Sequence, residues 1–346
     1  MARKNQSTKA KQSKKQSRRQ AASDVASQPG ASRPPTAEQT PVSPVPQVQA
    51  DEHVFLIGRP PMGEYLGYIQ TQTVDGDKVD PGALANEWRA ANDHIHDLEA
   101  QEAGWADNPV IADIPKHLEP LRNGAVANPN FHRSYSIVPT SVGIIELDRL
   151  VVFQKHINLE YVRLIRETLG QAPSDEDIFR FCLPFGQPRP GVQLRRVAQN
   201  SFIFVSPSND LRFLDCTVLQ PTQVSGYQPA GPMVGAVALV VGFGANCLSA
   251  LHVEKRLILQ NGSHRAFALR DAGITHVPCV IQTVSRREEL PVIATDPVNQ
   301  EPDLYLKAPR PPLLKDYFDP RLRKLVMVPK QNRQVKITFG VETIDV

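Results

Sequence analysis

The most chemically informative part of this sequence is the stretch of residues 256–269. An apolar run, Arg256-Leu257-Ile258-Leu259, leads into Asn261-Gly262, and a helical pattern begins directly at Ser263. Glycine tolerates a positive φ and allows close backbone approach, so the pattern predicts a strand, a tight turn and a helix. The first amides of a helix are free, and this end carries about half a positive charge. Such a helix start binds anions, phosphate above all.

The side chains at the same turn fit this chemistry. Arg265 can make a planar, two-pronged contact with phosphate. Ser263 can cap the helix or donate to the anion, and His264 can donate to it or move a proton. Together with Asn261 and Gly262 they form the expected phosphate site. The alternative is an ordinary turn in which Ser263 is a cap and Arg265 pairs with a surface acid.

This segment resembles the ParB/sulfiredoxin superfamily. The run Asn261-Gly262-Ser263-His264-Arg265-Ala266-Phe267-Ala268, followed by Ala272-Gly273-Ile274-Thr275-His276-Val277-Pro278, is similar to its strand, G-x-[H/R]-R-x-x-A turn and following strand. The unit Ile145-Glu146-Leu147-Asp148-Arg149-Leu150-Val151-Val152-Phe153-Gln154, with the helix after it, resembles the opening of the same domain. The resemblance covers roughly residues 142–172 and 233–284.

The resemblance implies a compact α+β domain that binds nucleotide phosphate at this turn. By position, Gly262, His264 and Arg265 would contact the phosphate, and the expected ligand is a nucleoside triphosphate with Mg²⁺. Ser263 stands where sulfiredoxin has its catalytic cysteine. Because a hydroxyl does not form the reactive thiolate, sulfiredoxin activity is not expected. The helix-turn-helix that follows the nucleotide domain of ParB is also not evident, so a role in chromosome partition is not expected.

Two further groups are candidates for the same site. Gln154, Lys155 and His156 precede a helix start, and in the family fold this place lies near the phosphate turn; the alternative is a surface loop. Glu146 and Asp148 lie two apart on an expected strand, which would place both on one face. Such a pair suits Mg²⁺ beside a triphosphate, and an exposed pair on an edge strand is the alternative.

Positive charge is concentrated in two segments, although the net charge of the chain is only +3. Residues 1–50 and residues 307–336 each hold nine basic and two acidic residues, so the rest of the chain is acidic. The first segment is polar and Pro-rich and is expected to be disordered. Aromatic residues are interleaved with the basic ones in and next to the second segment (Tyr305, Tyr317, Phe318 and Phe339). Both segments have a composition suited to binding nucleic acid. The alternative for the first is a solubilising tail. The alternative for the second is a Pro-rich segment that packs around the body, with its aromatic side chains in the core.

The hydropathy and the cysteine pattern of the sequence limit the class of protein to which the chain can belong. No run of about 18 apolar residues exists, and the basic N-terminus lacks the apolar part of a secretory signal. We therefore expect a cytoplasmic protein without a membrane partner. The four cysteines form no CxxC pair, which speaks against zinc and iron–sulfur sites and predicts reduced, mostly buried thiols.

The expected elements position the candidate site as follows. Helices are predicted over residues 80–102, 158–169 and 263–272, with a short one opening at residue 174. Strands are predicted over residues 66–73, 141–152, 192–197, 201–205, 211–219, 234–241, 256–259, 277–283, 322–329 and 334–341, the run 234–241 being buried. Residues 104–140 are expected to be irregular, and the chain after residue 285 to be peripheral.

Together these features predict an α+β protein in four parts. They are a basic disordered tail (1–50), an extension with strands and one helix (51–140), a ParB/sulfiredoxin-like mixed-sheet domain (141–284) with a strand-rich insertion at about 173–232, and a basic Pro-rich extension (285–346). The first hypothesis is a nucleotide-binding protein that hydrolyses or transfers phosphoryl groups. The second is a nucleic-acid-binding protein or nuclease that uses the same turn. The third is a non-catalytic interaction module.

Overall fold

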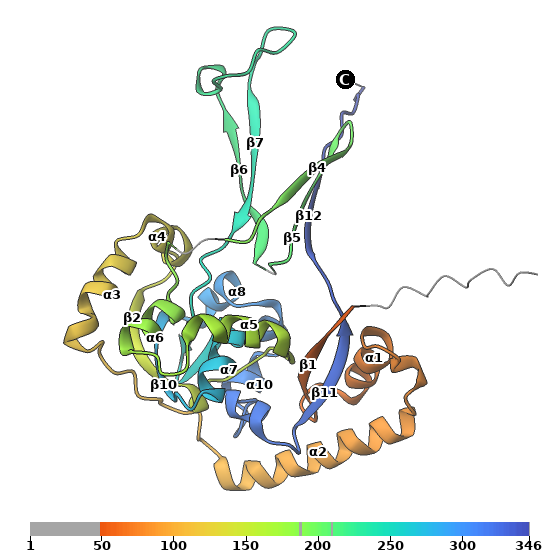
Figure 1. Ribbon diagram of the computed structural model, residues 1–346, viewed down its shortest axis with the longest axis vertical. Coiled ribbons are helices and arrows are strands. Elements are labelled where there is room, and N and C mark those ends of the chain that lie inside the picture. Colours follow the sequence, from red (N-terminus) through yellow and green to blue (C-terminus); the bar gives the residue numbers. More distant parts are fainter. Residues whose placement is uncertain (1–48, 187–188, 209, 346) are drawn as a thin grey trace, which may run out of the picture. The chain divides into compact units, whose positions relative to one another are not determined.

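The computed structural model describes residues 49–186, 189–208 and 210–345. They form a mixed α+β structure with four sheets of two to four strands and with helices between them (Figure 1). The tail predicted over residues 1–50 lies outside the described residues up to residue 48. No helix in the described ranges combines the length and the apolar character needed to cross a bilayer.

The central sheet holds four strands in the order β2-β10-β8-β9. They are β2 (Thr140–Glu146), β10 (His276–Val284), β8 (Ser249–Val253) and β9 (Arg256–Asn261). Strands β10 and β8 are parallel, and the other two pairs are antiparallel. Helices α5 (Leu159–Leu169), α6 (Asp175–Cys182) and α7 (Ser263–Asp271) pack with this sheet around the largest apolar core (Figure 1). This sheet and α7 together position the turn at Gly262.

Capping residues set the starts of the helices that were predicted correctly. Asp80 accepts the amides of Gly82 and Ala83 at the start of α2 (Pro81–Glu102). Asn158 accepts an amide at the start of α5, and Ser174 forms a reciprocal capping box with Asp177 at the start of α6. Each cap satisfies amides that the first helical turn leaves free, which fixes where the helix begins.

A second sheet joins the two ends of the described chain. Its order is β11-β1-β3, with β11 (Arg323–Pro329), β1 (Ala50–Leu56) and β3 (His156–Asn158), and both pairs are antiparallel. Strand β1 serves two cores because its side chains alternate between its faces. Val54 and Leu56 join the main core, whereas Phe55 packs with α1 and α2 in a separate core.

Two expectations about the N-terminal part are wrong. The predicted strand 66–73 is helix α1 (Met62–Gln72), in which Tyr65 and Ile69 are buried. These two residues are four apart and therefore share one helical face. Residues 104–140 are not simply irregular, since they contain α3 (Glu119–Val126) and α4 (Pro129–Tyr135), each with a proline in its first turn.

The C-terminal part is not peripheral, contrary to expectation. Its helices α8 (Leu290–Ile293), α9 (Asp296–Gln300) and α10 (Pro302–Leu306) are short, and its strand β11 is part of the second sheet. Tyr305 and Tyr317 are buried, so these aromatic residues fill the core. The basic residues that pair with carboxylates are Lys307, Arg310, Lys315, Arg321 and Lys324. Their partners are Asp303, Asp316 and Asp319 within the C-terminal part, and Glu87 and Glu102 of α2.

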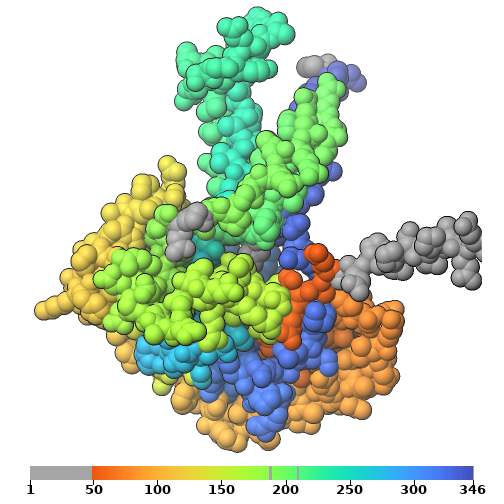
Figure 2. All heavy atoms as spheres, viewed as in Figure 1, coloured from red at the N-terminus to blue at the C-terminus, as the bar shows by residue number. Residues whose placement is uncertain are grey.

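Two β structures extend beyond this body (Figure 1). One is a three-stranded sheet of β12 (Arg333–Thr338), β5 (Ser201–Ser206) and β4 (Gln193–Ala198), in that order. The other is a ribbon of β6 (Leu211–Leu219) and β7 (Ala236–Phe243), here called the β6–β7 arm. In the space-filling view both stand clear of the helices (Figure 2). The strands were predicted, but the run 234–241 is largely exposed rather than buried.

Short 3₁₀ helices complete the described structure. They are η1 (Gly76–Lys78), η2 (Lys116–Leu118), η3 (Leu147–Arg149), η4 (Pro221–Gln223), η5 (Arg287–Glu289) and η6 (Leu314–Phe318). The four cysteines are free thiols, of which Cys182, Cys247 and Cys279 are buried and Cys216 is exposed. This confirms the prediction of reduced and mostly buried thiols.

Candidate functional site

The predicted strand, turn and helix are present at residues 256–271. Strand β9 ends at Asn261, and α7 begins at Ser263. Gly262 between them has a φ of 91°. A Cβ at this position would lie 2.9 Å from Leu248 Cδ1 and 3.0 Å from Leu248 Cα. The turn therefore needs glycine both for its conformation and for the close approach of residue 248.

We expect Gly262→Ala to lower the free energy of unfolding by more than the about 1–3 kcal/mol typical of a strained backbone conformation. The methyl group adds crowding against the backbone at Leu248. Gly273→Ala is the matched control, since Gly273 also has a positive φ, 81°, with no atom within 4 Å of the added Cβ. Urea unfolding of both variants measures the difference. Equal losses of unfolding free energy in the two variants would show that the close approach of Leu248 does not contribute to the effect.

The start of α7 is left free of side-chain caps. Gly262 occupies the cap position and offers no side chain, and the first helical bond runs from the Ala266 amide to the Gly262 carbonyl. In the part of the chain that the structure describes, the amides of Ser263, His264 and Arg265 have no hydrogen-bond partner. Three N–H groups and the positive end of the helix thus point to one place.

Ser263 does not cap the helix. Its Oγ donates to Gln154 Oε1 at 3.0 Å. The carbonyl of Gln154 in turn accepts from the Tyr317 hydroxyl. Gln154 is thereby fixed at both its side chain and its backbone, and it forms one wall of the turn.

Arg265 is a largely buried cation. Its Nη1 donates to Asn246 Oδ1 at 2.8 Å, and its guanidinium carbon lies 5.9 Å from the centre of the Phe181 ring. Burial lowers the pKa of the guanidinium, but an arginine remains charged at neutral pH. Across residues 49–186, 189–208 and 210–345 no carboxylate forms an ion pair with it. The expected alternative, in which Arg265 pairs with a surface acid, is therefore wrong.

The carboxylate that interacts electrostatically with Arg265 forms its ion pairs with other arginines. Asp210 interacts electrostatically with Arg265, and it pairs with Arg212 and, at 3.8 Å, with Arg189. Burial raises the pKa of this carboxyl even so. Arg265 is thus held by a neutral amide and an aromatic face, which leaves its charge uncompensated.

His264 is a neutral histidine. Its Nε2 accepts the amide of Asn158 at 3.1 Å, and its ring meets Tyr161 edge-on at 5.1 Å. Burial, with smaller contributions from His156, His53 and Arg265, lowers its pKa to about 3. Because Nε2 is an acceptor, the proton of the neutral ring is on Nδ1. His264 therefore meets a ligand as an uncharged donor.

Gln154, Lys155 and His156 were predicted to lie near the turn at Gly262, and only Gln154 lines its cavity. Lys155 pairs with Glu64 and faces a different cavity. His156 packs against His53, with their Nδ1 atoms 3.1 Å apart. Both expectations are wrong: Lys155, which precedes β3, reaches Glu64 of α1, and the pairing of β3 with β1 places His156 against His53.

Glu146 and Asp148 also lie elsewhere. Asp148 is in η3 rather than on a strand, and it pairs with Arg270 at 2.6 Å, while Glu146 pairs with Arg149 at 3.0 Å. Arg270 belongs to the last turn of α7, at the opposite end from Gly262. The expected metal pair is therefore wrong. No group of three His, Cys, Asp or Glu side chains within the described ranges is arranged to hold a metal ion.

The turn lines a cavity of about 90 Å³. Its walls are Gln154, Tyr161, Asn246, Gln260, Asn261, Gly262, Ser263, His264 and Arg265. Gln154 also lines a larger cavity of about 310 Å³, together with the charged residues Arg59, Glu64, Lys155 and Glu301 and several apolar side chains. The five residues predicted for the turn thus share one cavity with Gln154.

Three residues of this wall were not predicted. Asn246 lies in the loop 244–248 between β7 and β8 and contacts Arg265, 19 residues further along the chain. Tyr161 comes from α5, and Gln260 is the penultimate residue of β9. Gln260 could have been found, since it adjoins the motif, but nothing in the local sequence marks Asn246 or Tyr161. Comparison of the chain with known protein families, with curated proteins and with solved structures finds no match in any of the three.

Proposed function

We propose that the start of α7 binds the phosphate of a nucleotide, as in the ParB/sulfiredoxin-like domain that the sequence resembles. One observation carries this proposal. Arg265 is a largely buried cation with no carboxylate partner among the described residues, and it lies at the uncapped start of a nine-residue helix. A buried charge without a partner is costly, and an anion in the adjoining cavity would offset that cost.

The donors around the cavity suit an anion rather than a cation. They are the amides of Ser263, His264 and Arg265, the guanidinium of Arg265 and the Nδ1–H of His264. Asn246 and Gln154 hold Arg265 and Ser263 in place. Fixed donors of this kind bind phosphate without having to reorganise.

The volume restricts which part of a ligand enters. A cavity of about 90 Å³ accepts a phosphate group, but it is well below the size of a pocket for a whole drug-sized ligand. The nucleoside would therefore lie outside it. Two cavities share a wall residue with it: one of about 310 Å³ through Gln154 and one of about 990 Å³ through Asn246. A magnesium ion does not fit the residues at the turn, which offer no carboxylate, so it would be carried by the phosphates alone.

Binding is the activity that these residues support best. Hydrolysis or phosphoryl transfer needs a group that accepts a proton near neutral pH. His264 accepts a backbone amide at Nε2, and its pKa of about 3 makes it a poor base. Among the described residues of the cavity wall there is no carboxylate. The proposal is thus a nucleotide-binding protein, with turnover not assigned to any residue.

Titration calorimetry tests the proposal with ATP, CTP, GTP and inorganic phosphate as ligands. We expect at least one nucleotide to bind and Arg265→Gln to weaken its binding at least about tenfold, since a charge-assisted hydrogen bond contributes about 1.5–3 kcal/mol. Arg270→Gln is the matched control, because Arg270 lies on the same helix but pairs with Asp148 at the far end. If the natural chain binds none of these ligands, or if both variants bind equally well, the proposal is wrong.

A nucleic-acid backbone is the second candidate for the same turn. It is favoured by the sheet β12-β5-β4, which carries Arg195, Arg196, Arg333 and Lys336 and no acidic residue. All four of these side chains are exposed. Single-stranded DNA and RNA oligonucleotides at increasing salt distinguish this candidate. Steep weakening with salt, together with competition by the oligonucleotide against nucleotide, would support it.

A further inference from the structure

The sheet of β12, β5 and β4 has two faces of different chemistry. In an antiparallel sheet, directly paired residues share a face, and successive residues of one strand alternate between the faces. The register places two aromatic rings and two arginines on one face, here called the aromatic face: Phe202, Phe204, Arg196 and Arg333, with Leu194, Val335 and Ile337. The opposite face holds no aromatic residue and consists mainly of Ile203, Val205, Arg195, Lys336, Gln193 and Gln334.

The positive charge of this sheet has no acidic counterpart in its strands. The three strands contain four basic residues, two on each face, and no acidic residue. All four basic side chains are exposed. Arg196 donates to the carbonyls of Ala198 and Gln199, and Arg333 donates to a backbone carbonyl of β6. Because these guanidinium groups meet neutral oxygens in the described structure, the sheet attracts a polyanion.

Two rings of the aromatic face lie along one strand. Phe202 and Phe204 are two residues apart on β5, so their Cα atoms are separated by about 7 Å, at about 3.4 Å per residue. Both side chains are half-buried, and the guanidinium carbon of Arg196 lies 5.7 Å from the centre of the Phe202 ring. Adjacent bases of a duplex strand are only about 3.4 Å apart. Bases that stack on both rings must therefore be separated from each other, which a single strand permits and a duplex does not.

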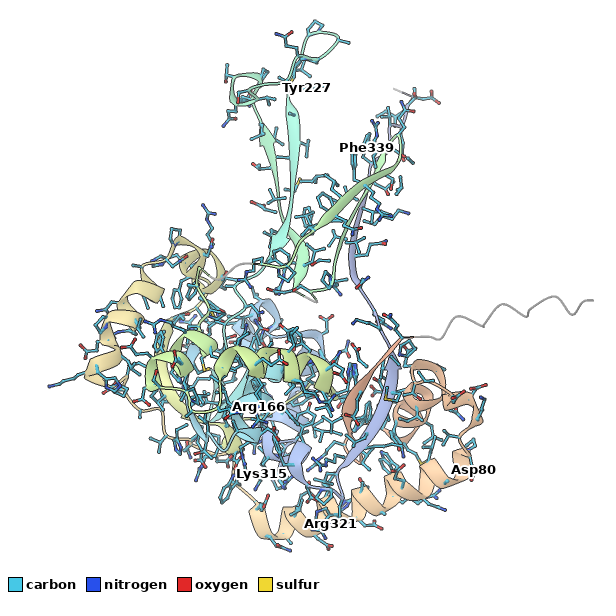
Figure 3. The ribbon with its side chains drawn as sticks, in the orientation of Figure 1. Asp80, Arg166, Tyr227, Lys315, Arg321 and Phe339 are labelled. Carbon is cyan, nitrogen blue, oxygen red and sulfur yellow. The ribbon has the colours of Figure 1, made fainter. Side chains whose placement is uncertain are left out.

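A third ring extends the aromatic face beyond the end of β12. The amide of Phe339 donates to the carbonyl of Asn200 at 3.1 Å, which continues the pairing of β12 with β5 by one residue. Phe339 follows Ile337 by two residues and so lies on the same face, where it is 50% exposed (Figure 3). Aromatic side chains along one sheet face, with arginines beside them, form a platform on which successive bases of a single strand stack.

We infer that the aromatic face of the sheet β12-β5-β4 binds single-stranded nucleic acid. Bases stack on Phe202 and Phe204, and Arg196 and Arg333 contact the backbone phosphates. A partner recognised by charge alone would meet two cations on either face, so the rings select the aromatic face and a ligand with flat groups between its charges. The site is separate from the turn at Gly262, and the inference holds whether or not that turn binds a nucleotide.

Fluorescence anisotropy with labelled oligothymidylate and oligouridylate of about 12 nucleotides tests the inference, since sites of this kind cover about 4–16 nucleotides. We expect both to bind the natural chain and a duplex of the same length to bind more weakly. Phe202→Leu with Phe204→Leu removes the rings but keeps apolar side chains, and it should weaken binding at least about tenfold because base stacking is lost. Phe202→Tyr with Phe204→Tyr keeps both rings and should retain the affinity of the natural chain.

Two variants with the same loss of charge locate the phosphate contacts. Arg196→Gln with Arg333→Gln neutralises the aromatic face, and Arg195→Gln with Lys336→Gln neutralises the opposite face. For a single strand, each phosphate contact contributes about 0.7 to the slope of the logarithm of the binding constant against the logarithm of the salt concentration. The first variant should therefore lower this slope by about 1.4, and the second should leave it unchanged.

Calorimetry with ATP, CTP and GTP on the variant Phe202→Leu with Phe204→Leu separates this site from the turn at Gly262. Nucleotide binding at the turn should equal that of the natural chain, so either proposal can fail without the other. Should the leucine variant not fold, as far-ultraviolet circular dichroism reports, the charge variants decide, because their side chains are exposed. No binding of the single strands, equal affinity for the duplex, full binding by the folded leucine variant or equal slopes in the two charge variants would each overturn the inference.

Discussion

Replacing Arg310 with alanine is expected to lower the free energy of unfolding by about 3–5 kcal/mol, because it leaves a buried carboxylate without its partner. Arg310 is 1% exposed and Asp316 3%. Its Nη1 and Nη2 donate to the two oxygens of Asp316 at 3.0 and 2.6 Å, and its Nε donates to Glu102 at 2.8 Å. After the substitution, Asp316 keeps the Leu313 amide as its remaining donor in the described structure. Urea unfolding measures the loss.

Two controls separate burial from charge in this experiment. Arg166→Ala removes an ion pair with Asp271 in which both side chains are more than 40% exposed, and it should cost less than about 1 kcal/mol. Arg166 lies on the surface of α5 (Figure 3). The double variant Arg310→Met with Asp316→Leu removes both charges and should recover most of the lost stability. A loss for Arg310→Ala no larger than that for Arg166→Ala would contradict the buried ion pair.

Lowering the pH from 7 to 5 is expected to reduce the free energy of unfolding by about 2–4 kcal/mol through His264 and His156. Burial lowers the pKa of His264 to about 3 and that of His156 to about 4, from an ordinary value of 6.5. In the unfolded chain both titrate near 6.5, so the unfolded state takes up protons first as the pH falls. The stabilisation is therefore full above about pH 6.5 and is lost progressively below it.

Variants of single histidines assign this pH dependence. His156→Gln and His264→Gln should each make the decline between pH 7 and 5 shallower, by up to about 1.4 kcal/mol per pH unit. His276→Gln should leave the decline unchanged, because His276 is exposed. Urea titrations at half-unit steps of pH provide the data. A decline that is the same in all three variants would show that the buried histidines do not cause it.

Local signals in the sequence were enough to predict the turn that carries the candidate site. Gly262 after an apolar strand marks the turn, and Asn158 and Ser174 mark the starts of the helices packed near it. Each of these signals acts through residues within one helical turn. The mixed α+β class follows from the same local patterns.

The predictions that were wrong concern features that depend on contacts between residues far apart in the sequence. Local spacing at Gln154, Lys155 and His156 does not show which side chain faces the turn, because β3 decides it by pairing with β1. The tautomer of His264 depends on the amide of Asn158, 106 residues away. The burial predicted for β7 failed because an apolar run does not reveal whether any layer covers it.

The pairing of β1 with β11 has a consequence for synthesis of the chain on the ribosome. Ala50 pairs with Pro329 and Leu56 with Arg323, so the partner of β1 emerges roughly 270 residues later. At about 5–20 residues per second, translation delays this pairing by roughly 15–55 seconds. During that interval Phe55 lacks the strand that completes its core. Nascent chains stalled before residue 323 should therefore recruit chaperones at this strand and release them once β11 has been made.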